Sequence, residues 1–180
     1  YYRGQGVSQD YEMAFQLYGK AAVQRFPYAY YELAKMYRDG IGTETNADEA
    51  ELNFEEAFYG FKRLEEQNHD DKLQYRLGWM LLNGVGTDKD ETRAKEYFEK
   101  AASVGNPFAC YQLAKLILSD EKAQPQEVEK ALGYLRKAVE AENPYAAYFL
   151  GKLYEKGQHV PQNTAEAVQL YTLSAEQGND

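Results

Sequence analysis

The chain has 180 residues, a formal net charge of −9 at pH 7 and a sequence pI of about 4.9. Hydrophobic residues make up 44% of it, a share that supports a folded core rather than a disordered chain. The acidic balance argues against a non-specific nucleic-acid binder, which needs a net basic surface.

Apolar spacing predicts two helical segments at the start of the chain. Residues 1–7 are typical of the tail of a helix, and residues 10–24 read as a complete helix. The small and apolar residues of the second segment recur at helical spacing, at Ala14, Leu17, Tyr18, Ala21 and Ala22. Together the two segments are expected to form a trailing half repeat over residues 1–27.

A phrase with the pattern Tyr-x-Leu-(Ala/Gly) then recurs four times, starting at Tyr31, Tyr75, Tyr111 and Tyr148. Its leucines are 44, 36 and 37 residues apart, at positions 33, 77, 113 and 150. A period in this range predicts a stacked array of helix pairs in which each pair packs on its neighbours. We expect a single array over residues 1–180, with repeats at 28–71, 72–106, 107–143 and 144–180. The chain would then start within a repeat, as a fragment of a longer array or multidomain protein.

Each repeat is predicted to contain two helices joined by a turn. The Gly-x-Gly sequences at 40–42 and 84–86 are interpreted as helix ends, because glycine readily adopts left-handed backbone. The third repeat lacks these glycines and uses a polar turn over residues 119–125. The first repeat is 8 residues longer than the second (44 against 36). We place these residues between Thr43 and Asp71, as a lengthened second helix or an acidic turn.

These phrases resemble the Sel-one-like repeat (SLR) family, a relative of the tetratricopeptide repeat (TPR). The family pattern is Ala-x-Tyr-x-Leu-Gly-x-x-Tyr-x-x-Gly-x-Gly, followed by a helix that ends Ala-Ala-x-x-Gly-(Asn/Asp). The first and last repeats match it at Ala29, Tyr31, Leu33, Tyr37, Gly40 and Gly42, and at Ala146, Tyr148, Leu150, Gly151, Tyr154 and Gly157. The departures, Leu73, Leu81, Ile117 and the missing glycines after Leu118, affect local packing only.

The resemblance implies an all-α fold, a right-handed α-solenoid superhelix of antiparallel helix pairs with a concave face. Family members serve as adaptors and assembly scaffolds in bacterial envelope, signalling and protein-quality-control systems, so a bacterial source is expected. The leading hypothesis is a non-catalytic scaffold that binds a peptide or partner surface on the concave face.

Twelve residues of the first helices are the candidate partner-binding residues, if those helices line the groove as the resemblance implies. Positions five before, two before and two after the recurring leucine share one helix stripe. They are Tyr28, Lys72, Phe108 and Tyr145; Tyr31, Tyr75, Tyr111 and Tyr148; and Lys35, Trp79, Lys115 and Lys152. Aromatic anchors among lysines suit an acidic peptide or a C-terminal carboxylate. The tyrosines two before leucine belong to the family pattern, so packing between repeats is the alternative for them.

No catalytic, cofactor or metal site is predicted. His69 and His159 are the only histidines, and neither has a second ligand at metal-binding spacing. Cys110 lacks a nearby activating group and is expected to be a buried or half-buried thiol. A hydrolase is not expected, because the cysteine-rich relatives that it would resemble have paired cysteines that this chain lacks.

The sequence restricts the cellular location of the protein and its alternative roles only weakly. The single cysteine excludes an intrachain disulfide framework, and no apolar stretch reaches the length of a membrane span. A cytoplasmic location is favoured, and a periplasmic one stays open because a signal could have been removed. Two alternative roles are a structural spacer of a larger multidomain protein and an accessory module of a relaxase-type mobilisation protein. Open array ends would also allow end-to-end self-association.

Overall fold

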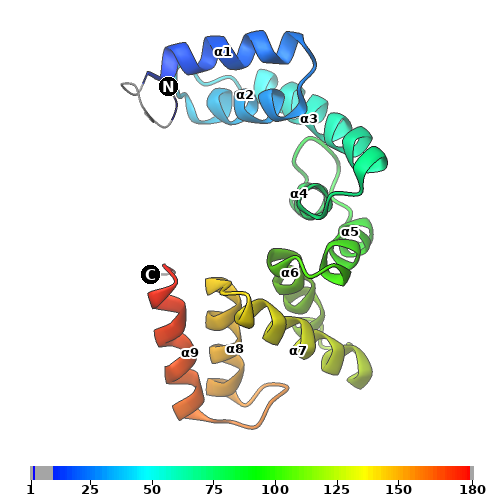
Figure 1. Cartoon of the computed structure of the whole chain (residues 1–180), viewed down its shortest axis with the longest axis vertical. Helices are drawn as coiled ribbons and strands as arrows, with labels where there is room; N and C mark the ends of the chain where they lie inside the picture. Colours follow the sequence, from blue (N-terminus) through cyan, green and yellow to red (C-terminus); the bar gives the residue numbers. More distant parts are fainter. Residues whose placement is uncertain (1, 3–9, 179–180) are drawn as a thin grey trace. The chain divides into compact units, whose positions relative to one another are not determined.

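The computed structural model describes Tyr2 and residues 10–178, and within these residues the chain forms nine α-helices and no β-strand (Figure 1). The expectation of an all-α helical-repeat fold is therefore confirmed. The helix tail predicted over residues 1–7 lies outside the described part of the chain, except for Tyr2. The helices are α1 (Tyr11–Val23), α2 (Pro27–Asp39), α3 (Ala47–Asn68), α4 (Asp71–Asn83), α5 (Glu91–Ser103), α6 (Pro107–Leu118), α7 (Pro125–Glu140), α8 (Pro144–Lys156) and α9 (Thr164–Glu176).

The chain divides into two compact units, one up to Ala94 and one from Lys95, so the division falls inside α5. In the first unit α2 packs against both α1 and α3, and α3 packs against α4. In the second unit α6 packs against α7, and α8 packs against α9 and α7. The paired helices run antiparallel, as α1 with α2 and α8 with α9 show (Figure 1).

The core of each unit is built from the leucine of the recurring phrase and from small residues on the facing helices. Leu77 and Leu113 are fully buried, and Leu33 and Leu150 are each only 5% exposed. Burial of a leucine side chain contributes about 2 kcal/mol, so this position alone explains much of the repeat pattern. Fully buried alanines let the helix axes approach closely, at Ala57, Ala101 and Ala138.

Asparagine and aspartate side chains fix where the helices begin. Each accepts a hydrogen bond, 2.9–3.1 Å long, from the backbone N–H three residues later. Such a cap contributes about 1 kcal/mol of helix stability. The capping residues are Asp10, Asn46, Asp70, Asp90, Asn106, Asn143 and Asn163.

The two glycines of each Gly-x-Gly turn have different roles. Gly40 and Gly84 end α2 and α4 in the left-handed conformation, as the sequence predicts. The second glycines, Gly42 and Gly86, are also left-handed, but a Cβ there would overlap backbone of the second helix of the preceding repeat. It would meet the Tyr11 carbonyl of α1 at Gly42 and the Phe54 carbonyl of α3 at Gly86. Helix termination thus explains only the first glycine, and the second permits close packing of consecutive repeats.

The extra residues of the first repeat lie in α3, which has 22 residues where α5 and α9 have 13. The turns before these helices, residues 40–46, 84–90 and 157–163, are equal in length. None of the helices in the described part of the chain is long and apolar enough to cross a lipid bilayer.

Candidate partner-binding surface

The twelve candidate residues lie on α2, α4, α6 and α8, the first helices of the repeats, and none of them is fully buried. We call these twelve residues the first-helix surface. Six of them are exposed: Tyr28, Lys72, Phe108, Lys115, Tyr145 and Tyr148. The other six are half-buried: Tyr31, Lys35, Tyr75, Trp79, Tyr111 and Lys152. A side chain that serves only the core would be shielded from water, so all twelve keep some capacity to contact a partner.

Three of the first helices carry the same tyrosine–lysine pair. The lysine ammonium lies over the ring of the tyrosine one turn earlier, 5.4 Å from its centroid on α2, 5.9 Å on α6 and 5.6 Å on α8. The pairs are Tyr31–Lys35, Tyr111–Lys115 and Tyr148–Lys152. This i,i+4 geometry holds a cation against an aromatic face. Lysine–tyrosine contacts also occur on the second helices α5 and α7, so the distinctive feature is the repetition at one register.

In the first unit, an arginine and three aromatic rings form a compact group that we call the aromatic–arginine cluster. Its members are Tyr28 and Tyr31 of α2, Phe61 of α3 and Arg76 of α4. The Phe61 ring is fully buried and lies 4.9 Å from the Tyr28 ring and 5.9 Å from the Tyr31 ring, between ring centroids. Phe61 thus supports both tyrosines from beneath, and the cluster joins three consecutive helices.

In the second unit, the tyrosines of the first-helix surface contact one another and the next repeat. The rings of Tyr111 on α6 and Tyr145 on α8 are stacked with their centroids 6.1 Å apart. Tyr111 also meets Phe149 edge-on at 6.2 Å, and Tyr148 lies 5.5 Å from Tyr171 of α9. These tyrosines therefore pack between helices and still present part of the ring to solvent, so the two interpretations offered for them are not exclusive.

The candidate residues Lys72 and Trp79 belong neither to the tyrosine–lysine pairs nor to the aromatic contacts described above. Among the described residues, no ring or cation contact links Lys72 or Trp79 to the other members of the first-helix surface. Trp79 is half-buried, and it occupies the α4 position where the other first helices carry the lysine of the pair. The second repeat accordingly offers an indole where the others offer a cation.

Sequence reasoning missed four residues that shape this surface: Phe61, Arg76, Phe149 and Tyr171. Arg76 and Phe149 precede the recurring leucine, and both contact a tyrosine of the preceding repeat. A comparison of this position across repeats could have found them. Phe61 lies in the lengthened part of the first repeat, where no aligned position exists to compare.

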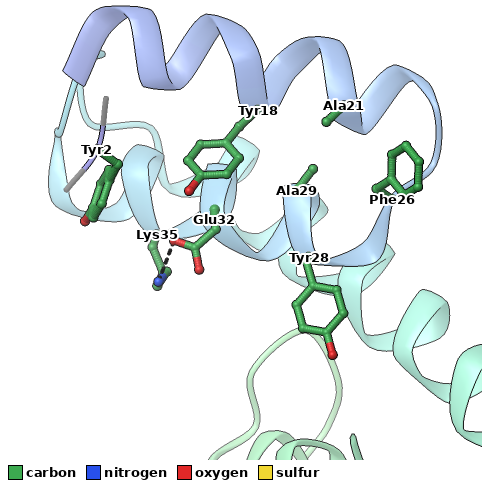
Figure 2. Close-up of a pocket in the computed structure, with 8 residues that line it drawn as sticks. All are labelled: Tyr2, Tyr18, Ala21, Phe26, Tyr28, Ala29, Glu32 and Lys35. Atoms are coloured by element: carbon green, nitrogen blue, oxygen red, sulfur yellow. Dashed lines mark ion pairs between the residues drawn. The ribbon is translucent and has the colours of Figure 1, made fainter. Parts of the chain in front are cut away.

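A pocket of about 450 Å³ opens between α1 and α2, beside the first-helix surface (Figure 2). Tyr18 lines it from α1, and Glu32 and Lys35 line it from α2 as an ion pair 2.7 Å long. Tyr28 also contributes to the lining, and the remaining lining residues are Tyr2, Ala21, Phe26 and Ala29. Half of these eight residues are aromatic, which suits an apolar side chain of a bound segment.

The hydroxyl of Tyr171 donates a hydrogen bond of 2.7 Å to Glu155, and this bond anchors the ring against Tyr148. Burial, together with the hydrogen bond, raises the pKa of Tyr171 from 10.0 to about 12. An absorbance titration of the folded parent is expected to show a late ionisation step near pH 12, assigned to Tyr171, that is missing in the unfolded chain. Tyr171→Phe should remove the late step and Glu155→Gln should shift it to lower pH.

The sign of the linked stability change follows from the raised pKa. Because the folded state holds this proton more tightly, its contribution to stability is complete below pH 10 and is lost as the pH rises towards 12. A Tyr171→Phe variant should therefore lose less stability than the parent across this interval. Equal pH dependence of the two proteins would contradict the assignment.

Cys110 is buried, as expected, and its thiol lies 3.8 Å from the Ala102 carbonyl oxygen. Burial raises the pKa of this thiol above its usual range, an effect that Lys137 only partly offsets. The native protein should therefore react with a disulfide reagent at least about tenfold more slowly than the protein in denaturant. Equal rates in the two conditions would contradict this description of the site.

Within the described residues, no three or more His, Cys, Asp or Glu side chains gather where a metal ion could bind. His69 ends α3 in a left-handed conformation. His159 occupies the place of the second turn glycine in the fourth repeat, also with a positive φ. Its Nε2 lies 3.0 Å from the Leu118 carbonyl oxygen and donates to it, since a carbonyl only accepts. Both histidines therefore have structural positions in turns.

Known proteins share the helical-repeat fold of this chain. A family model described as the Sel1 repeat matches residues 1–24, 27–59, 72–106, 107–143 and 144–179. A solved Sel1 repeat protein from Oxalobacter formigenes is 28% identical with a TM-score of 0.72, covering 99% of this chain and 67% of that chain. An immunity protein from Pseudomonas aeruginosa is 26% identical with a TM-score of 0.58, covering 95% of this chain and 60% of that chain.

A curated relative, the chitin synthase regulator SKT5 of Malassezia restricta, is 30% identical over 116 residues. The match covers 64% of this chain but only 8% of that much longer protein. Sel1 repeat proteins generally act as protein-interaction scaffolds without catalytic activity. The family match across nearly all of the sequence and the helical-repeat neighbours show that this chain belongs to the Sel1 repeat family.

Proposed function

We propose that this chain is a non-catalytic module that binds a segment of a partner protein on the first-helix surface. The observation that carries the proposal is the tyrosine–lysine pair, repeated at one register on α2, α6 and α8. The family resemblance implies that the first helices of the repeats line the concave face, and we propose that α2, α4, α6 and α8 do so here. Within the second unit, a protein segment lying across α6 and α8 would meet the same pair of chemical groups twice.

The chemistry of the pair favours an acidic partner segment with apolar side chains. Tyrosine rings give large contact area and are common anchors at protein interfaces. The ammonium groups of Lys115 and Lys152 attract carboxylates, on a protein whose net charge is −9, whereas that of Lys35 already pairs with Glu32. Interfaces of this kind gain selectivity from charge and affinity from the aromatic anchors.

Structural packing alone does not require the exposure that the rings retain. Tyr28 and Tyr145 are each 50% exposed, although each ring already contacts a neighbouring ring. A purely structural role would be served by a smaller apolar side chain that leaves less apolar surface in water. The exposed half of these rings is the part that we assign to the partner.

Charge reversal on the first helices tests this function. Crosslinked pull-downs from the source cell would compare the parent with Lys115→Glu/Lys152→Glu, and we expect at least about tenfold lower partner recovery for the variant. The matched control is Lys100→Glu/Lys130→Glu, which makes the same charge change at lysine–tyrosine contacts on the second helices. Equal recovery by both double variants would place the binding surface elsewhere.

A structural spacer is the second candidate, and exposed apolar residues on α1 favour it. Tyr11, Met13 and Leu17 are between 38% and 43% exposed on that helix. Such a surface suits the stacking of another helix, in the same protein or in a second copy. Light scattering over a range of protein concentrations tests the stacking of a second copy on α1. Self-association through α1 should disappear in a Met13→Ser/Leu17→Ser variant, while binding of a partner to the first-helix surface should persist.

A further inference from the structure

Arg76 is held against aromatic rings in a way that the protein-scaffold role does not by itself explain. Its guanidinium carbon lies 4.8 Å from the Tyr31 ring centroid, 5.5 Å from that of Tyr28 and 5.3 Å from that of Phe61. The side chain is half-buried in the first unit. Stacking on three rings restricts the guanidinium and fixes the direction in which its N–H groups point.

The donors of Arg76 have no acceptor in the described part of the protein. None of the ion pairs there involves Arg76, and no carbonyl or side chain accepts a hydrogen bond from it. The guanidinium nitrogens of Arg76 are not fully buried, so they remain in contact with solvent. A half-buried arginine usually pairs with a carboxylate, because desolvation of an unpaired cation is costly.

We propose that Arg76 binds a side-chain carboxylate, Asp or Glu, of an acidic peptide segment, with its guanidinium positioned by the aromatic–arginine cluster. This inference rests on the proposed function and names the chemistry of its partner. The planar guanidinium can donate two parallel hydrogen bonds to a carboxylate, and a stacked guanidinium loses little further freedom on binding.

Two neighbouring features fit this occupant. Lys72 lies one turn before Arg76 on α4, on the same side of the helix, and it is exposed. The two cations form a local basic site on a protein with a net charge of −9, which gives the site charge complementarity to an acidic segment. Tyr28 is half exposed beside Arg76 and offers apolar contact to the residue next to the bound carboxylate.

An array of peptides blocked at both ends, probed with the intact chain, tests the assignment. Each peptide that binds is made again with every Asp and Glu changed to Asn and Gln. Affinities for both forms are then measured with the parent, Arg76→Gln, Arg76→Lys and the control Arg136→Gln, an exposed arginine on α7. Circular dichroism confirms that each variant keeps the helicity of the parent.

We expect one acidic residue of the peptide to be coupled to Arg76. Its neutralisation and Arg76→Gln should each weaken binding about tenfold or more, and the two changes combined should weaken it little further. Arg76→Lys should fall between the parent and Arg76→Gln, because it keeps the charge and loses the paired donors. Arg136→Gln should bind as the parent does.

Other outcomes would overturn the inference in distinguishable ways. Peptides that lose affinity with Lys115→Glu/Lys152→Glu but not with Arg76→Gln would remove the role of Arg76 and leave the proposed function standing. If peptides of the same array bind only when they are remade with a free C-terminus, or only when they are remade in phosphorylated form, another anion replaces the side-chain carboxylate. If no peptide binds the parent, both the proposed function and this inference fail.

Discussion

Replacing Gly86 by alanine is expected to lower the free energy of unfolding by about 2–5 kcal/mol, measured by denaturant titration of the helical signal. Gly86 has a φ of +64°, which costs a residue with a Cβ about 1–2 kcal/mol. The added Cβ would also overlap the backbone of Phe54, which cannot move without shifting α3. Overpacking against a fixed neighbour costs a further 1–3 kcal/mol or so.

Gly84 provides a matched control in the same turn. Its φ is +66°, nearly the same, but the nearest atom to an added Cβ is the flexible Lys89 side chain, at 2.8 Å. Gly84→Ala should therefore cost only the backbone contribution, about 1–2 kcal/mol. If the two variants lose equal stability, the close approach between this turn and α3 does not contribute, and our account of repeat stacking is wrong.

The second large effect is expected at Phe61, whose replacement by alanine should destabilise the protein by about 3–5 kcal/mol. The side chain is fully buried, and its ring contacts Tyr28, Tyr31 and Arg76. The substitution leaves a cavity beneath the first-helix surface of the first unit. The same denaturant titration measures the loss, and ring resonances of Tyr28 and Tyr31 should shift with it.

Tyr59 is the control for this substitution, because it lies on the same helix and its side chain is 54% exposed. Tyr59→Ala removes a ring of similar size and should cost no more than about 1 kcal/mol, including its contact with Phe58. A comparable loss in both variants would mean that helix propensity rather than burial of Phe61 stabilises α3.

Much of the fold follows from periodicity in the sequence. The recurring leucine marks a core position in every repeat, because a helix pair has only one strip that faces its partner. The role of the first glycine of each turn can also be predicted from the sequence, since helices commonly end in a left-handed residue. The role of Gly86 could not be predicted from the sequence, because it depends on which part of the preceding repeat's backbone lies against this glycine.

Less of the candidate site than of the fold could be predicted from the sequence. Helical spacing placed Tyr31 and Lys35 on one stripe, and the structure brings them into contact. Arg76 was missed because its contacts depend on the rotation of α4 relative to α2, which no single-helix pattern contains. Trp79 was expected on the candidate stripe, but its half-buried state could not be predicted, because the orientation of a helix decides how much of a large ring its neighbours cover.

Photocrosslinking from four exposed positions tests the central claim most directly. A crosslinking amino acid would replace Tyr28 or Tyr145 on the first helices, each 50% exposed, or Tyr59 or Val168 on the second helices, 54% and 57% exposed. We predict that one partner protein is captured in the source cell from positions 28 and 145 and not from the equally exposed positions 59 and 168. Capture of that partner mainly from positions 59 and 168 would contradict binding on the first-helix surface.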